Sequence, residues 1–176
     1  MKLTWFGGTT LRVYVGGEIV VVGADGAPNG VDRGELLAGA DRVVSSLGDP
    51  AVASIDPAAW RPKPAPRGID PVPPVDIVKI GPAALLIAAA GEPPLVVLAS
   101  GEPPRFGRWA DGAVIVLTSG RESFVAEATV LLDVARPRLV ALAADEQTLD
   151  TAIEELNEHL DGTALVSLEP GLALEV

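Results

Sequence analysis

The stretch TTLRVYVGGEIVVVG, residues 9–23, decides how the chain begins to fold. Its first half alternates apolar and polar side chains from Leu11 to Val15, and a period of two is typical of a strand with one buried face. Gly16 and Gly17 follow and predict a two-residue hairpin turn, because glycine adopts a positive φ without strain. The return strand over 18–23 is apolar enough to be buried on both faces. The N-terminal part is therefore predicted to be a β-sheet.

Length and hydropathy favour one soluble domain. The chain has 176 residues, 48% of them hydrophobic, and we expect a single domain over 1–176. The longest apolar run, residues 83–90, is much shorter than the roughly 20 residues of a membrane-spanning helix. The N-terminal sequence does not resemble a secretory signal. We therefore expect a cytoplasmic protein without a membrane partner.

The balance of acidic and basic residues and the apolar content indicate which partners the protein could bind. Lys and Arg number 13 against 24 Asp and Glu, which gives a net charge of −11. Such a surface repels phosphate backbones, and aromatic residues form only 4% of the chain, so we expect no nucleic-acid partner. The high apolar content with few bulky aromatics favours a homo-oligomer, in which part of the apolar surface is buried between subunits.

Two residue counts exclude whole classes of site. The chain has no cysteine, which excludes disulfides, zinc sites made of thiolates and cysteine nucleophiles. It has one histidine, His159. Any mechanism that needs two imidazoles from one chain is therefore excluded.

The middle of the chain is predicted to be a loop followed by strands. Eight of the 16 prolines lie within 50–74, where the density of fixed φ angles and missing donors predicts an extended surface loop, with Trp60 as a possible anchor. Apolar segments near 75–80, 83–90, 94–100 and 112–118 then predict an antiparallel meander. The tetrapeptide GEPP, at 91–94 and again at 101–104, is expected to reverse the chain each time.

The last third changes period. The spacing of Ser119 and Glu122 predicts a capped helix that runs to about 135. A strand is expected over 138–143, and a second helix follows, capped by Asp145 or Thr148. Its expected buried face comprises Leu149, Ile153, Leu156 and Leu160. Segments 164–168 and 172–176 are expected to form a closing hairpin. This order predicts an α/β or α+β layered protein.

The opening MKLTWFGGTTLRVYVGGEIVVVGAD, residues 1–25, resembles the start of the metallo-β-lactamase superfamily. The resemblance is to a branch similar to L-ascorbate-6-phosphate lactonase-like metal-dependent hydrolases, which open with a strand, a GHA or GHS turn and a hairpin. ADRVVSSLGDP (40–50), LASGEPP (98–104) and EATVLLDVARPRLVALAADE (127–146) resemble the regions that carry its metal ligands. The resemblance implies an αββα sandwich of two mixed β-sheets flanked by helices, reduced in size.

The departures from the family pattern concern the metal site. The positions that would carry ligands are Gly8; Leu47, Asp49, Ala51 and Val52; Glu102 or Gly101; and Ala143, Ala144 or Asp145. None of them is an imidazole, and a metal-activated water needs such ligands. The resemblance therefore implies a degenerate member that lacks the metal-ligand histidines, and we expect no catalytic residue and no cofactor.

Three functions remain open from the sequence. The first is a non-catalytic protein, a pseudoenzyme, that acts through binding or self-association. The second is a hydrolase with a carboxylate site for Mg²⁺ or Mn²⁺ at Asp49, Glu102 and Asp145, because hard cations prefer oxygen ligands. Asp49 beside Pro50 is typical of a turn, however, and Asp145 of a helix cap, and we favour that interpretation. The third is a small-molecule binder that uses the vestigial cleft.

Overall fold

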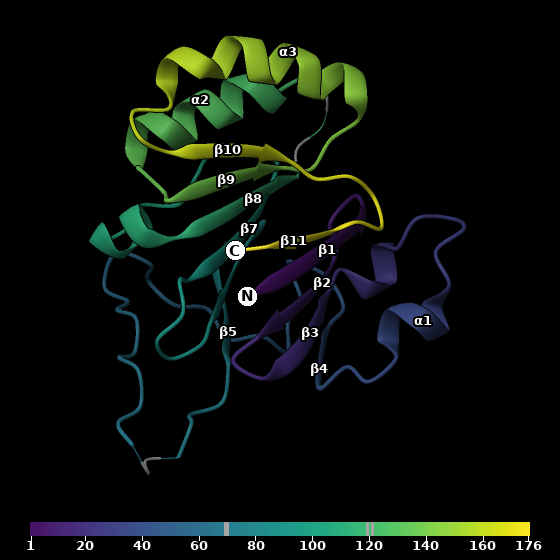
Figure 1. The fold of residues 1–176 in the computed structure, drawn as a ribbon, viewed down its shortest axis with the longest axis vertical. Coiled ribbons are helices and arrows are strands. Elements are labelled where there is room, and N and C mark those ends of the chain that lie inside the picture. Colours follow the sequence, from purple (N-terminus) through teal and green to yellow (C-terminus); the bar gives the residue numbers. More distant parts are fainter. Residues whose placement is uncertain (69–70, 119, 121) are drawn as a thin grey trace.

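The computed structural model describes residues 1–68, 71–118, 120 and 122–176. Within these ranges, two mixed β-sheets face each other and three α-helices cover their outer faces (Figure 1). The chain is thus α+β, and the expected pair of mixed sheets is confirmed. Helix α1 (Arg33–Leu37) covers one sheet, and α2 (Phe124–Val134) and α3 (Glu146–Leu156) cover the other.

The first sheet has the strand order β11-β1-β2-β3-β4. Its strands are β1 (Lys2–Gly7), β2 (Thr10–Val15), β3 (Glu18–Val22), β4 (Arg42–Val44) and β11 (Ala173–Glu175). The strands β1, β2 and β3 form an antiparallel meander, and β4 runs parallel to β3. Gly16 and Gly17 have φ angles of 58° and 84°, so the predicted hairpin turn is confirmed.

The second sheet has the strand order β10-β9-β8-β7-β6-β5. Its strands are β5 (Asp76–Gly81), β6 (Ala84–Ala88), β7 (Leu95–Ala99), β8 (Val114–Thr118), β9 (Leu139–Leu142) and β10 (Ala164–Ser167). From β5 to β7 the strands are antiparallel, and from β7 to β10 they are parallel. The helices α2 and α3 provide the crossovers that join β8 to β9 and β9 to β10.

The predicted meander is correct only in its first half. The first GEPP, at 91–94, lies in the reversal between β6 and β7. The second, at 101–104, follows β7 but does not reverse the chain, because β8 is parallel to β7. A long loop that contains the 3-10 helix η2 (Arg108–Gly112) carries the chain back to the start of β8. The tetrapeptide GEPP follows a strand in both places. It does not determine whether the next strand runs parallel or antiparallel, which depends on how that strand packs.

The predicted closing hairpin is wrong. The strand β10 extends the second sheet beside β9, whereas β11 extends the first sheet beside β1. A two-stranded hairpin is only marginally stable in water. By joining an existing sheet, each of these strands instead forms hydrogen bonds with a neighbouring strand and apolar contacts with a core. Val166 and Leu174 pack against the core between the sheets, and Leu165 packs on the helix side.

The interior is divided into layers. The largest core lies between the two sheets and includes Leu3, Leu11 and Val20 from the first and Leu85 and Val97 from the second. A second core lies between the second sheet and its helices, with Phe124 and Leu131 of α2 fully buried. A small third cluster packs α1 on the first sheet. Because the second sheet is covered on both faces, its central strands are apolar except for Thr118 at the end of β8.

The helix α3 is rotated relative to the prediction. Its buried residues are Thr148, Ala152 and Leu156, whereas Ile153 is 45% exposed. Leu149 and Leu160 are partly buried, as expected. The small side chains at 148 and 152 let the helix lie close to the layer beneath it, which places Ile153 on the flank. The expected helix cap Ser119 lies outside the described residues.

The proline-rich segment is a surface loop that is attached at defined points. Its described residues, 50–68 and 71–74, contain no helix. An isolated bridge between Ser54 and Lys79 and an ion pair of 2.6 Å between Lys63 Nζ and Asp76 Oδ2 connect them to β5. The ring of Trp60 packs edge-on against Trp109, with 4.9 Å between the ring centroids. Trp109 Nε1 donates to the carbonyl of Pro57 at 2.8 Å. The predicted role of Trp60 as an anchor is therefore confirmed.

Two buried threonines predict opposite responses to the same substitution. Thr163 is 6% exposed, and its hydroxyl has no hydrogen-bond partner among the described residues, whereas the Thr10 hydroxyl donates to the Gly23 carbonyl at 3.0 Å. We expect Thr163→Val to leave the free energy of unfolding unchanged or to raise it by up to about 1 kcal/mol. Thr10→Val removes a buried hydrogen bond, although the Gly23 carbonyl still accepts from the Gly26 N–H at 3.1 Å, and should lower that free energy by about 1 kcal/mol. Urea denaturation measures both, and equal losses would contradict the assignment.

The orientation of α3 gives a second prediction. Ile153→Ala should lower the free energy of unfolding by less than about 1 kcal/mol, because much of the side chain is in solvent. Leu156→Ala removes a fully buried side chain and should lower it by about 2–4 kcal/mol. Thermal and chemical denaturation of the two variants compare them directly. Similar losses would mean that Ile153 faces the core after all.

Candidate functional site

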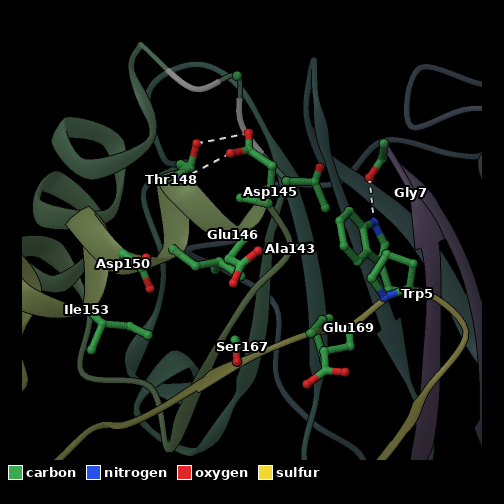
Figure 2. A pocket seen from close by; sticks show the side chains of 17 residues that line it. Trp5, Gly7, Ala143, Asp145, Glu146, Thr148, Asp150, Ile153, Ser167 and Glu169 are labelled. Atoms are coloured by element: carbon green, nitrogen blue, oxygen red, sulfur yellow. Dashed lines mark hydrogen bonds between the residues drawn. The ribbon is translucent and has the colours of Figure 1, made fainter.

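A cavity of about 970 Å³ opens where the two sheets meet at one end of the molecule (Figure 2). Its lining comes from β1 and the turn after it, from the ends of β8, β9 and β10, and from the first turns of α3. The strands β8, β9 and β10 are parallel, so their carboxyl ends lie along one edge of the sheet. Loops diverge from such an edge and leave a crevice, which is where ligands bind in many parallel sheets. The cavity is therefore the primary candidate for a functional site.

One wall comes from the first sheet. Trp5 is 6% exposed, and its Nε1 donates to the carbonyl of Gly8 at 2.9 Å. A Cβ at Gly7 would lie 2.6 Å from Pro28 Cγ, whereas a Cβ at Gly8 would meet nothing within 4 Å. The turn is thus closely packed at Gly7 and open to the cavity side at Gly8. Gly8, at the position where the resemblance expects histidine, lines the cavity.

The opposite wall begins with Asp145. This residue is the N-cap of α3, where Oδ1 accepts from the Thr148 backbone N–H at 3.1 Å and Oδ2 accepts from the Thr148 hydroxyl at 3.0 Å (Figure 2). A carboxylate at this position satisfies an N–H group that has no partner within the helix. The prediction of a helix cap at Asp145 is therefore confirmed. Both carboxylate oxygens are engaged by the helix that they cap.

The lining is acidic. Its charged residues are Asp145, Glu146, Asp150 and Glu169, and no Lys, Arg or His is found among the described residues that line it. The lining is completed by Thr118, Ser167 and apolar residues such as Trp5, Leu149 and Ile153. A concave site lined by one sign of charge concentrates ligands of the opposite sign. The arrangement thus favours a cation with an apolar portion.

Asp49 lies in a different part of the chain, in the loop that follows β4. Its Oδ2 accepts from the Ser45 hydroxyl at 2.7 Å and from the Ser45 backbone N–H at 3.0 Å, and its Oδ1 accepts from the Ala51 N–H at 2.8 Å. The Ser45 hydroxyl hydrogen bond is the main cause of a lowered Asp49 pKa, followed by the backbone bonds and the charge of Lys79. The carboxylate closes a turn, as the sequence favours.

The remaining predicted positions are dispersed. Leu47 is buried in the core between the sheets, and Val52 packs against the same core. Glu102 lies in the exposed loop after β7 and lines a separate depression of about 370 Å³. Of the vestigial positions Gly8, Leu47, Asp49, Val52, Glu102 and Asp145, the structure therefore brings only Gly8 and Asp145 to the cavity.

The residues present do not fit the metal centre that the family resemblance implies. Within the described part of the chain, no group of three or more His, Cys, Asp or Glu side chains could hold a metal ion. Asp49, Glu102 and Asp145 thus do not form one cluster, and Asp49 and Asp145 direct their oxygens to local hydrogen bonds. His159 is exposed in the 3-10 helix η3 (Asn157–His159) and does not line the cavity.

Several lining residues have no motif in the sequence. Ile153 was expected in the core, and Ser167 and Glu169 were expected in a closing hairpin, but all three line the cavity (Figure 2). For Ser167 and Glu169, the signal that could have found them is their position at the end of β10 and just after it. That signal becomes usable only when β10 is recognised as parallel to β9.

Comparisons with known proteins add no relative. No protein-family model, curated protein or solved structure matches the chain. In the ranges that the structure describes, no helix is both long and apolar enough to cross a membrane. The interpretation of the site therefore rests on its geometry.

The Asp49 turn predicts a pH-dependent contribution to stability. Its pKa is lower in the folded chain than in the unfolded chain, so its stabilisation is fully present above the unfolded value of about 3.9 and is lost as the pH falls through the folded pKa. Asp49→Asn should therefore lower the melting temperature at pH 7. The difference from the parent should shrink as the pH is lowered below about 4.

Melting curves between neutral and strongly acidic pH measure this difference. The control is Asp133→Asn, at an exposed carboxylate on α2 that makes no hydrogen bond with the described residues. Because the described residues give this carboxylate no hydrogen bond to lose, the melting temperature of Asp133→Asn should stay close to that of the parent over the whole pH range. An Asp49→Asn difference that is equally large in acid would contradict the role assigned to the ionised carboxylate.

Proposed function

We propose that this chain is a non-catalytic protein of metallo-β-lactamase-like fold that binds a small organic cation in the cavity between its sheets. The observation that carries the proposal is the cavity of about 970 Å³ at the carboxyl ends of β8, β9 and β10, with carboxylates and no basic side chain among its described lining residues. Ligand sites in proteins commonly have volumes of roughly 300–1,000 Å³. The cavity is at the upper end of that range.

Two features support the fold assignment. Two mixed sheets pack face to face with helices on both outer faces, which is the arrangement of a reduced αββα sandwich. Gly8 and Asp145 are far apart in sequence and line one cavity, as expected if both derive from the ligand positions of a metal site. The proposal is thus that the cavity is the remnant of a hydrolase active site.

The chemistry of the lining favours binding over catalysis. The Ser167 hydroxyl would need a neighbouring base to act as a nucleophile, and the described lining offers carboxylates but no imidazole or amine. Asp145 accepts two hydrogen bonds from Thr148. The alternative of a Mg²⁺ or Mn²⁺ hydrolase needs a cluster of oxygen ligands, and the candidate carboxylates are dispersed.

The ligand class follows from the charges and the apolar wall. A phosphate or carboxylate ligand would face Glu146, Asp150 and Glu169, and the described lining residues include no Lys or Arg to compensate. An ammonium group would be attracted to the same carboxylates. Trp5, Leu149 and Ile153 offer apolar contacts to the rest of such a ligand. An amine with an aromatic or aliphatic body satisfies both parts of the surface.

Titration with three probes of similar shape tests this proposal. Benzylammonium, benzyl alcohol and benzoate differ in charge and share the ring. We expect benzylammonium to shift the backbone amide resonances of Ser167, Leu149 and Ile153 in NMR spectra, benzyl alcohol to bind more weakly, and benzoate not to bind. Equal responses to the three probes, or none at millimolar concentration, would overturn the proposal.

A matched pair of variants separates local from overall charge. Glu169→Gln removes a carboxylate from the cavity, whereas Glu175→Gln removes one from β11 outside it. We expect the first to weaken benzylammonium binding by about two- to fivefold, the range of a partly exposed ion pair. The second should leave the affinity within experimental error. Equal weakening by both would indicate attraction by net charge alone.

A further inference from the structure

The two sheets present four edge strands, and three of them are protected against further pairing. The edge of β5 is partly covered by the proline-rich loop, since Lys79 N–H donates to the Ala53 carbonyl at 2.8 Å and Ile55 N–H donates to the Lys79 carbonyl at 3.0 Å. The strands β4 and β11 are three residues long and carry charges at Arg42 and Glu175. Short length, charge and cover are the usual means by which edges avoid association.

The fourth edge, β10, is also short, at four residues, but it lacks the charges of β4 and β11, and no described segment pairs with its open side as the proline-rich loop does with β5. Its sequence ALVS contains no charge and no proline. Ala164 N–H donates to the Arg138 carbonyl at 3.1 Å, and Leu168 N–H donates to the Leu142 carbonyl at 2.8 Å. Because backbone groups alternate sides along a strand, Leu165 and Ser167 direct their N–H and C=O groups away from β9. No described strand pairs with that side of β10.

We propose that β10 is a self-association edge, which pairs antiparallel with β10 of a second copy of this chain. With a two-fold axis at Val166, Leu165 lies opposite Ser167 of the second copy and exchanges both main-chain hydrogen bonds with it. The same pair recurs on the other side of the axis, as closed two-fold symmetry requires. The two six-stranded sheets become one continuous sheet.

Charge complementarity identifies a second copy as the occupant. The exposed Arg138 lies beside the beginning of β10, where its carbonyl accepts from Ala164, and the exposed Glu169 follows the end of the strand. Antiparallel pairing places the Glu169 end of each copy beside the Arg138 end of the other. The pairing residues themselves are uncharged, so the net charge of −11 is kept away from the contact line.

The proposal does not rest on ligand binding. The contact uses the backbone edge of β10, whereas the cavity uses side chains at the end of the same strand. A chain that dimerises without binding benzylammonium would support the edge and overturn the ligand. A chain that binds benzylammonium but stays monomeric would support the ligand proposal and overturn the proposed self-association edge.

Sedimentation velocity and light scattering over roughly 1–200 µM protein, a range suited to micromolar dissociation constants, test the proposal. Ser167→Pro removes an outward N–H while leaving the bonds between β10 and β9 in place, and proline is tolerated on such an edge. Ser167→Ala removes the same hydroxyl and keeps the N–H. We expect a dimer of the parent chain, unchanged affinity for Ser167→Ala, and at least about tenfold weaker dimerisation for Ser167→Pro.

If Ser167→Pro does not fold, a second variant tests the proposal. Ala164→Lys places a charge at an exposed position on the edge and should also weaken dimerisation, although it brings the net charge closer to zero. A parent chain that stays monomeric over the whole range would overturn the proposal. So would a dimer that persists in a folded Ser167→Pro variant, or in Ala164→Lys when the proline variant is unfolded.

Discussion

The apolar contact between the inner faces of the two sheets is the constraint on which the rest of the structure depends. Leu3, Leu11 and Val20 on one side and Leu85 and Val97 on the other are essentially excluded from solvent. Burial of this kind contributes about 25 cal/mol per Å² of apolar surface. Because the two apolar faces must pack on one another, the relative position of the sheets is fixed. The positions from which the loops leave the ends of the strands are then fixed as well. The cavity lies at one of those ends.

The region from Ser45 to Val52 lies where the resemblance places a metal-binding loop, but its side chains serve packing and turn formation. At the place where the resemblance expects a loop of metal ligands, Leu47 contributes to the core and Asp49 closes a turn. Lys79 Nζ donates to the Asp49 carbonyl at 2.9 Å and attaches the turn to β5. The loop is thus held by hydrogen bonds and apolar packing, with no need for an ion at its centre.

Local patterns in the sequence predicted much of the fold. The period of two in β2, the glycine pair at 16 and 17 and the cap at Asp145 each depend on near neighbours, and each is found in the structure. Pairing partners depend on distant residues, and there the predictions failed. The segment 164–168 gives no local sign that it lies beside β9. The exposure of Ile153 depends on how closely α3 approaches the layer beneath it, which its own spacing does not determine.

The pairing of β11 with β1 has a consequence for folding. Leu3 lies opposite Leu174, so the edge of the first sheet is completed by a strand that is synthesised after all the others described. Such non-local contacts slow folding, because the loop must close before the contact contributes any stability. Until then β1 has one open side, and the wall of the cavity that Trp5 forms lacks the bond from Gly171 N–H to the Trp5 carbonyl. The cavity is therefore among the last parts of the molecule to take shape.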